Sequence, residues 1–165
     1  MMERTVSENA AAIAMARSLG ITILGAPKPR LAPDLASLEV AIERAWSAAT
    51  SYYKDWTPTN PAYGQCAVTA LVVQDYFGGE LVMQVITPGE AHFWNRLKDG
   101  SKVDLTERQF SLAPAIREMA TSNPVRQRVL AFPATAARYS LLKAAVEKNL
   151  MEMEAPSIES ALAAS

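Results

Sequence analysis

The stretch NPAYGQCAVTAL, from Asn60 to Leu71, contains the only cysteine of this 165-residue chain. The ten residues 55–64 are rich in proline and other turn formers, so we expect a loop there. From Gln65 to Phe77, small and apolar residues recur at helical spacing, and Gly78 follows as a terminator. The pattern predicts a helix over 65–77 with Cys66 in its first turn.

A cysteine at this position has two readings. Free cysteine is among the most buried residue types, so Cys66 can be a small apolar residue of the core. The start of a helix also favours the thiolate over the thiol, because unpaired backbone N–H groups and the helix dipole are positive there. The second reading makes Cys66 a nucleophile, which requires a base and an orienting acid elsewhere in the chain.

The residues after Gly78 predict a small antiparallel sheet. Residues 80–87 form a short apolar run bounded by glycine and proline, which favours a buried strand. Residues 91–97 and 101–105 flank an Asp-Gly pair, the strongest hairpin signal in the chain. The first of these strands carries the sole histidine, His92, and the second carries Asp104.

The length of the hairpin loop decides whether His92 and Asp104 can meet. A two-residue Asp-Gly loop would turn Asp104 to the face opposite His92. A three-residue loop, 98–100, would place the glycine in the left-handed conformation and pair Leu97 with Ser101. The two side chains would then be diagonal neighbours on one face, roughly 7–8 Å apart at the backbone. We expect the three-residue loop.

Each partner also has an ordinary explanation. His92 has apolar and aromatic neighbours in sequence and can be a hydrogen-bonded core histidine, while Asp104 can be a surface strand residue or a turn cap. Acting together, a thiolate would attack, an imidazole would take and return a proton, and a carboxylate would fix the imidazole tautomer. The order along the chain, with no second histidine, predicts a Cys66–His92–Asp104 triad.

The amino-acid composition argues against several classes of protein. The 16 basic and 17 acidic residues show no basic cluster, so we expect neither a nucleic acid nor a membrane as partner. No apolar run approaches the roughly 20 residues of a membrane helix. One cysteine and one histidine cannot complete a zinc site, and no glycine-rich phosphate loop is present, so no cofactor is expected. The lone cysteine and the absence of a leader pattern favour the cytoplasm.

The rest of the chain predicts helices around this core. Residues 1–33 are expected to form an N-terminal extension, with a helix from Ser7 to Leu19 and a proline-rich connector. The main domain, 34–151, would open with an amphipathic helix from Asp34 to about Thr50 and close with a helix over 135–151. A short helix near 114–120 and a tail, 152–165, that either adds a last helical turn or two or frays, complete the prediction.

Three motifs together resemble a known family. They are WTPTNPAYGQCAVTALVVQD, then HFWNRL, then VDLTERQF after the Asp-Gly turn. Over about residues 38–142 the chain resembles the YunG family of small bacterial proteins. Its nucleophile helix also looks like that of transglutaminase-like and papain-like cysteine enzymes, in which a cysteine opens a buried helix.

The resemblance implies an α+β fold of the papain/transglutaminase type, with a helix-borne cysteine against a small antiparallel sheet and flanking helices. It implies Cys66 as nucleophile, His92 as base and Asp104 as orienting acid. The Cys66 backbone N–H is one expected oxyanion donor. The candidates for a second donor or for a pocket wall are Gln65, Trp56, Trp94 and Asn95, for which ordinary packing is the alternative.

The leading functional hypothesis is a cysteine-dependent hydrolase or acyltransferase that acts through a thioester on a small amide or peptide. The alternative is a catalytically idle member of the same fold that binds a ligand or protein in its cleft. A third reading is a module that forms a homo-oligomer through its Ala-rich N-terminal helix.

Overall fold

The computed structural model describes residues 32–110, 118–121 and 123–154. The helix predicted over 7–19 and the tail from residue 155 lie outside the described residues. So does most of the proline-rich connector. The predicted division of the chain at residues 33 and 151 stays a prediction.

Helix α2, Leu35–Ala45, begins at Asp34, whose carboxylate accepts a 2.7 Å hydrogen bond from the Ser37 backbone N–H. It ends five residues before the predicted end. Thr50 explains the early end, because its hydroxyl accepts from the Ser47 N–H and donates to the Ser47 carbonyl, at 2.9 and 3.0 Å. Such local bonds give the backbone an alternative to the helix.

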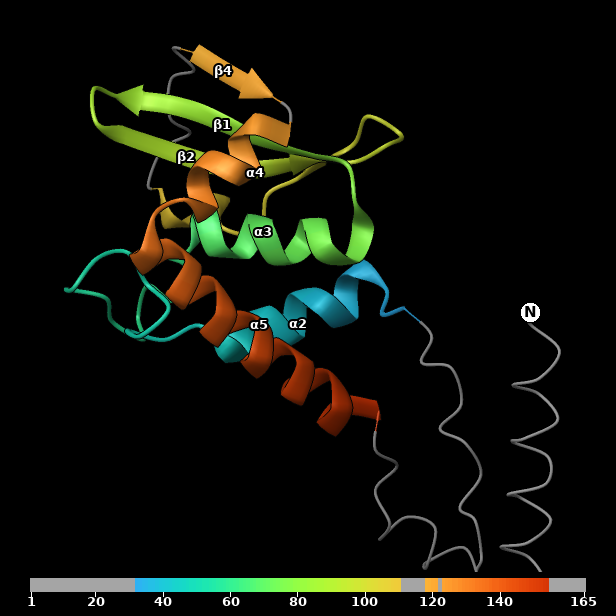
Figure 1. Cartoon of the computed structure of the whole chain (residues 1–165). Helices are drawn as coiled ribbons and strands as arrows, with labels where there is room; N and C mark the ends of the chain where they lie inside the picture. The colour runs from blue at the N-terminus through green and yellow to red at the C-terminus, as the bar shows by residue number, and fades with distance from the viewer. Residues whose placement is uncertain (1–31, 111–117, 122, 155–165) are drawn as a thin grey trace, which may run out of the picture. The chain divides into compact units, whose positions relative to one another are not determined.

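Helix α3, Cys66–Phe77, confirms the predicted central helix and places Cys66 at its first residue. Gly78 ends it with a φ of 68°, a left-handed value that favours glycine. Six consecutive residues, 68–73, are buried, so α3 is covered on all sides rather than along one stripe. Figure 1 shows why: α3 lies between the sheet and the pair α2 and α5.

The described residues contain a four-stranded antiparallel sheet in the order β3-β2-β1-β4. Its strands are β1 Glu80–Thr87, β2 Glu90–Arg96, β3 Lys102–Val103 and β4 Glu118–Thr121. The prediction for β1 is confirmed at both ends. Strand β3 is shorter than the predicted 101–105, because the chain turns away at residue 104.

The short helix predicted near 114–120 is wrong over residues 118–120, and its first residues lie outside the described part. Residues 118–121 instead pair with β1, with Glu118 opposite Val85 and Thr121 opposite Val82. This pairing satisfies backbone groups at the open edge of β1, a long-range gain that outweighs local helix propensity.

The hairpin loop has the predicted three residues. The Leu97 N–H donates to the Ser101 carbonyl at 2.9 Å, and the Gly100 N–H donates to the Leu97 carbonyl at 3.0 Å. Gly100 has a φ of 87°, as the bulge turn requires. In the ladder that follows, Arg96 pairs with Lys102 and Asn95 with Val103. The predicted register is therefore confirmed.

Two helices follow the sheet. Helix α4, Asn123–Leu130, was not predicted, and helix α5, Pro133–Glu154, begins two residues before the predicted start. The buried residues of α5 are Leu142, Val146 and Leu150, at helical spacing. A short 3-10 turn, η1 Glu107–Gln109, follows β3.

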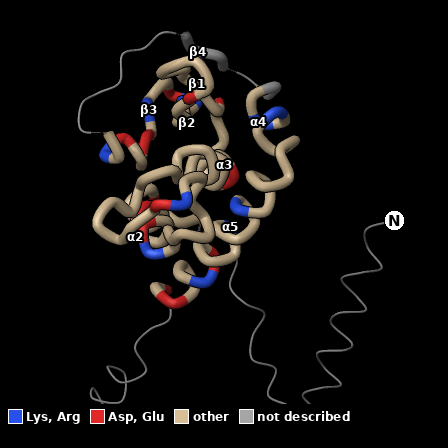
Figure 2. Tube along the Cα trace, turned by 90° about the vertical axis from the view of Figure 1, so that its left-hand side faces the viewer, with Lys and Arg blue, Asp and Glu red and all other residues tan. Residues whose placement is uncertain are grey.

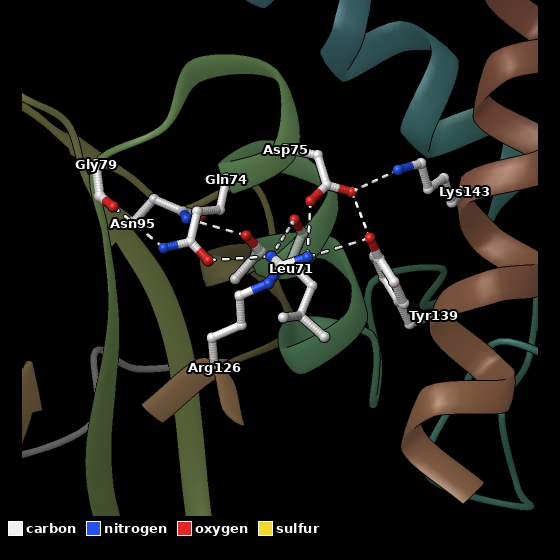
Figure 3. A network of polar contacts seen from close by, with 9 residues as sticks. Leu71, Gln74, Asp75, Gly79, Asn95, Arg126, Tyr139 and Lys143 are labelled. Carbon is white, nitrogen blue, oxygen red and sulfur yellow. Dashed lines mark hydrogen bonds and ion pairs between the residues drawn. The ribbon is translucent and has the colours of Figure 1, made fainter. Parts of the chain in front are cut away.

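Arg126 of α4 ties these helices to α3 (Figure 3). Its guanidinium donates to the Leu71 carbonyl at 3.3 Å, to Gln74 Oε1 at 3.0 Å and to Asp75 Oδ1 at 2.8 Å. The Asp75 carboxylate also accepts from the Tyr139 hydroxyl and the Lys143 ammonium of α5. One arginine and one aspartate thus join three helices.

Two buried clusters hold the layers together. One joins α2, α3 and α5, and the other joins α3 to β1 and α4. Figure 2 shows α3 between the sheet and the helices α2 and α5, with acidic and basic residues interspersed over the elements. Among the described helices, none combines the length and apolar character needed to cross a bilayer.

Candidate active site

Cys66 lies where the loop 55–64 enters helix α3. Its thiol is half-buried, with Sγ 4.0 Å from the Ala91 carbonyl oxygen of β2. The loop reaches this point through Gly64, which has a φ of 71°, and a Cβ there would overlap the hydroxyl of Ser51. Within the described residues the Cys66 backbone N–H has no hydrogen-bond partner, so a free donor and the positive end of α3 adjoin the sulfur.

His92 and Asp104 meet as the hairpin register predicts. The Nε2 atom of His92 is 2.8 Å from Oδ2 of Asp104, and the side chains are only 2% and 4% exposed. Lys102 Nζ lies 3.3 Å from the same carboxylate oxygen, and the Thr106 hydroxyl donates to Oδ1 at 3.3 Å. The ring of Phe110 meets the imidazole edge-on, with centroids 4.9 Å apart. The carboxylate is held in place, and it holds the imidazole.

The surroundings favour the charged forms of both groups. Burial alone would lower the pKa of His92, but hydrogen bonds to Asp104 and Cys66 and the charges of these two groups raise the pKa to about 9. Burial would raise the pKa of Asp104, but the hydrogen bond and charge of His92, together with Lys102, lower it. Asp104 and Cys66 thus favour the protonated imidazole, whereas burial opposes it.

Gln109, the last residue of η1, completes the polar cluster. Its Oε1 accepts from the Gly64 N–H at 3.3 Å, which turns its Nε2 toward His92 Nδ1, also at 3.3 Å. An amide N–H can donate to Nδ1 only when that nitrogen carries no proton. Since Nε2 is engaged by Asp104, this hydrogen bond favours the neutral imidazole and opposes the protonation of His92 at Nδ1.

A cavity of about 700 Å³ adjoins this cluster. Its lining includes Cys66, Ala91, Gln109 and Phe110 but not His92 or Asp104. The size is that of an ordinary small-molecule site. A ligand in the cavity would meet the thiol and the Gln109 amide directly.

The four further candidates from the sequence lie away from the cavity lining. Gln65 is fully buried and its amide donates to the Ser47 carbonyl at 3.0 Å, while its Oε1 has no partner. Trp56 Nε1 donates to the Pro61 carbonyl, and Asn95 donates to the Ala70 carbonyl, both at 2.9 Å. Trp94 is buried, with Arg96 and Lys102 near its ring. The roles of these four residues as second oxyanion donor or pocket wall stay predictions.

Sequence reasoning missed Gln109 and Phe110. Both belong to the motif VDLTERQF that carried the family resemblance, and that membership was the available signal. Two arginines that line the cavity were missed as well: Arg128 belongs to α4, which was not predicted, and Arg138 belongs to α5. Within the described residues, no group of three or more His, Cys, Asp and Glu side chains is placed to hold a metal ion.

Fold and site together define an α+β protein in which a cysteine at a helix start adjoins a buried histidine–aspartate pair. Residues 34–151 match the family described as YunG protein, and the chain belongs to this family. The predicted resemblance to it is thus confirmed.

A curated relative supports the same assignment. The chain is 39% identical over 69 residues to a Bacillus subtilis (strain 168) protein named "Uncharacterized protein YunG". This match spans 42% of the present chain and 56% of the relative's length. No solved structure matches the chain.

Proposed function

We propose that this protein is a cysteine-dependent hydrolase or acyltransferase that works through a thioester on Cys66, with a site arranged as in transglutaminase-like and papain-like enzymes. The observation that carries the proposal is that the two ring nitrogens of His92 have separate roles. Asp104 binds Nε2, which leaves Nδ1 to exchange protons with the reacting groups. A base held in one orientation by a buried acid is the arrangement that nucleophilic catalysis requires.

The acylation step follows from this arrangement. The Cys66 thiolate attacks the carbonyl carbon of an amide, and the carbon–nitrogen bond breaks. The leaving amine takes its proton from His92 Nδ1, and the acyl group stays on sulfur as a thioester. Asp104 stabilises the imidazolium until that proton is transferred.

The second step releases the acyl group. Water or an amine gives a proton to His92 Nδ1 and attacks the thioester, so that a carboxylic acid or a new amide leaves and the thiolate returns. In both steps negative charge develops on the carbonyl oxygen. The Cys66 N–H and the Gln109 Nε2–H are the donors placed to stabilise it, because both adjoin the cavity.

Binding of a carbonyl would also free His92 Nδ1 from the Gln109 amide. When the Gln109 N–H turns to the substrate oxygen, Nδ1 loses that hydrogen bond and can exchange its proton with the reacting groups.

A direct test is to trap the thioester. Incubation with p-nitrophenyl acetate should give one acetyl group per wild-type chain, located on Cys66 by peptide mass spectrometry and removed by hydroxylamine. His92→Ala should slow acylation at least tenfold. Ser47→Ala, a change outside the cavity lining, is the control and should acylate at the wild-type rate. Acetyl groups on surface lysines alone would refute the proposal.

The competing function is a ligand-binding module without catalysis. It is favoured by one observation: the His92 side chain is 2% exposed and is not among the residues that line the cavity. In that case Cys66→Ser would leave ligand binding unchanged, and no thioester would form with any acyl donor.

A further inference from the structure

We infer that the cavity binds an N-acyl amino acid, with an apolar acyl group along the aromatic wall and a free carboxylate at the arginines. The inference rests on the proposed function for the position of the scissile amide beside Cys66. The ligand class itself follows from the lining of the cavity.

The lining is mostly apolar and aromatic. The apolar part comes from α3, the sheet and α4, through Val68, Met83, Phe93, Val125 and Val129. Two further lining aromatics, Tyr52 and Phe132, are each 67% exposed. Large exposed aromatic rings beside an apolar cavity are typical of a binding site rather than of a sealed core.

The charged residues of the lining indicate that the polar end of the ligand is an anion. The lining contains two arginines, Arg128 and Arg138, and one acid, Glu90, so it carries a net positive charge. Among the described residues Arg128 has no hydrogen-bond or ion-pair partner. Arg138 donates through Nη2 to the Thr135 hydroxyl at 2.9 Å and lies 5.4 Å from the centre of the Tyr52 ring. A guanidinium fixed on one side still offers donors, and a carboxylate is its natural partner.

In an N-acyl amino acid, an amide links an apolar acyl group to a group that carries a carboxylate. Cys66 would attack the carbonyl carbon of this amide. Its acyl carbon would form the thioester, and the amino acid would leave with a proton from His92. Water then releases the free acid. The overall reaction consumes one amide and one water and yields one carboxylic acid and one amino acid.

Binding can be measured apart from catalysis in the full-length Cys66→Ser chain. Isothermal titration calorimetry with N-acetylglycine and N-hexanoylglycine should show tighter binding of the longer acyl group, about fourfold per methylene and roughly 250-fold over its four additional methylenes. N-hexanoylglycinamide, which lacks the carboxylate, should bind about tenfold more weakly than N-hexanoylglycine. Equal affinity for the two acyl lengths, or for acid and amide, would overturn the inference.

Matched variants place the ligand in the cavity. Ala134 lines the cavity and Ala137 does not, although both are exposed residues of α5. In the Cys66→Ser background, Ala134→Phe should remove most of the chain-length preference and Ala137→Phe should leave it intact. Likewise Arg138→Gln should remove the preference for the carboxylate, whereas Arg44→Gln, an exposed change on α2, should not. A preference that survives both cavity variants would contradict this site.

Failure of the two proposals can be told apart. If Cys66→Ser binds with these preferences but the wild type never forms a thioester, the ligand class stands and the catalytic proposal fails. If the wild type is acylated on Cys66 but no preference is measured, the reverse holds.

Discussion

His92 Nε2 lies 2.8 Å from Asp104 Oδ2, although 12 residues separate them and the strand that carries the histidine ends before the loop. The contact exists because the loop has three residues. With two, the aspartate would fall on the other face of the hairpin. The position of a single backbone bond, Leu97 N–H to the Ser101 carbonyl, thus decides whether the acid reaches the base.

The histidine should titrate far from its ordinary range. NMR of the imidazole, unambiguous because the chain has one histidine, should give a pKa of about 9 in the wild type. Asp104→Asn should lower that pKa, because burial lowers the pKa of His92 and the carboxylate that counteracts it is then absent. Cys66→Ser should lower the pKa by a smaller amount. An identical titration in all three proteins would contradict the contacts described.

The same pKa makes a prediction about stability. A pKa raised on folding stabilises the protein fully below the ordinary value of 6.5, and this stabilisation is lost as the pH rises through about 9. Urea unfolding of the wild type should therefore show a falling free energy of unfolding across this window. His92→Gln should lack that contribution.

Gln109→Leu should change two rates in opposite directions. Loss of the amide removes a hydrogen bond that favours the neutral imidazole, so His92 should be protonated more readily and alkylation of Cys66 by iodoacetamide in the empty site should rise about twofold to threefold. Loss of the oxyanion donor should slow acylation by p-nitrophenyl acetate about 100-fold. Gln127→Leu, an exposed change on α4, is the control. A fall in both rates would mean that Gln109 is only structural.

Arg126 should carry a large share of the stability of α4. Arg126→Leu leaves the Asp75 carboxylate and the Leu71 carbonyl without a donor from α4, and should lower the free energy of unfolding by about 2–3 kcal/mol. Gln127→Leu should change it by less than about 0.5 kcal/mol. Chemical denaturation gives both values, and equal losses would remove this role from the network in Figure 3.

Local signals explain what could be predicted from the sequence. Two elements depend mainly on residues that are close in sequence. They are the loop 55–64 with the helix that ends at Gly78, and the Asp-Gly turn between apolar runs. They place Cys66 at a helix start and His92 beside Asp104. Strand β4 could not be predicted in this way, because it forms only where the edge of β1 is available.

The cavity and Gln109 also depend on contacts between distant segments. Gln109 matters because Gly64, 45 residues earlier, fixes the orientation of its amide. The arginines belong to α4 and α5, of which α4 has no strong periodic pattern in the sequence. The spacing of residues along the chain does not predict contacts between segments that are far apart in sequence.

The rate at which iodoacetamide modifies Cys66 at pH 7 tests the central claim most directly, because the chain has a single thiol and mass spectrometry reads it without ambiguity. A nucleophile paired with His92 should react at least tenfold faster than free cysteine, and His92→Ala should abolish the excess. A wild-type rate equal to or below that of free cysteine, unchanged by His92→Ala, would show that Cys66 is a residue of the core and not a nucleophile.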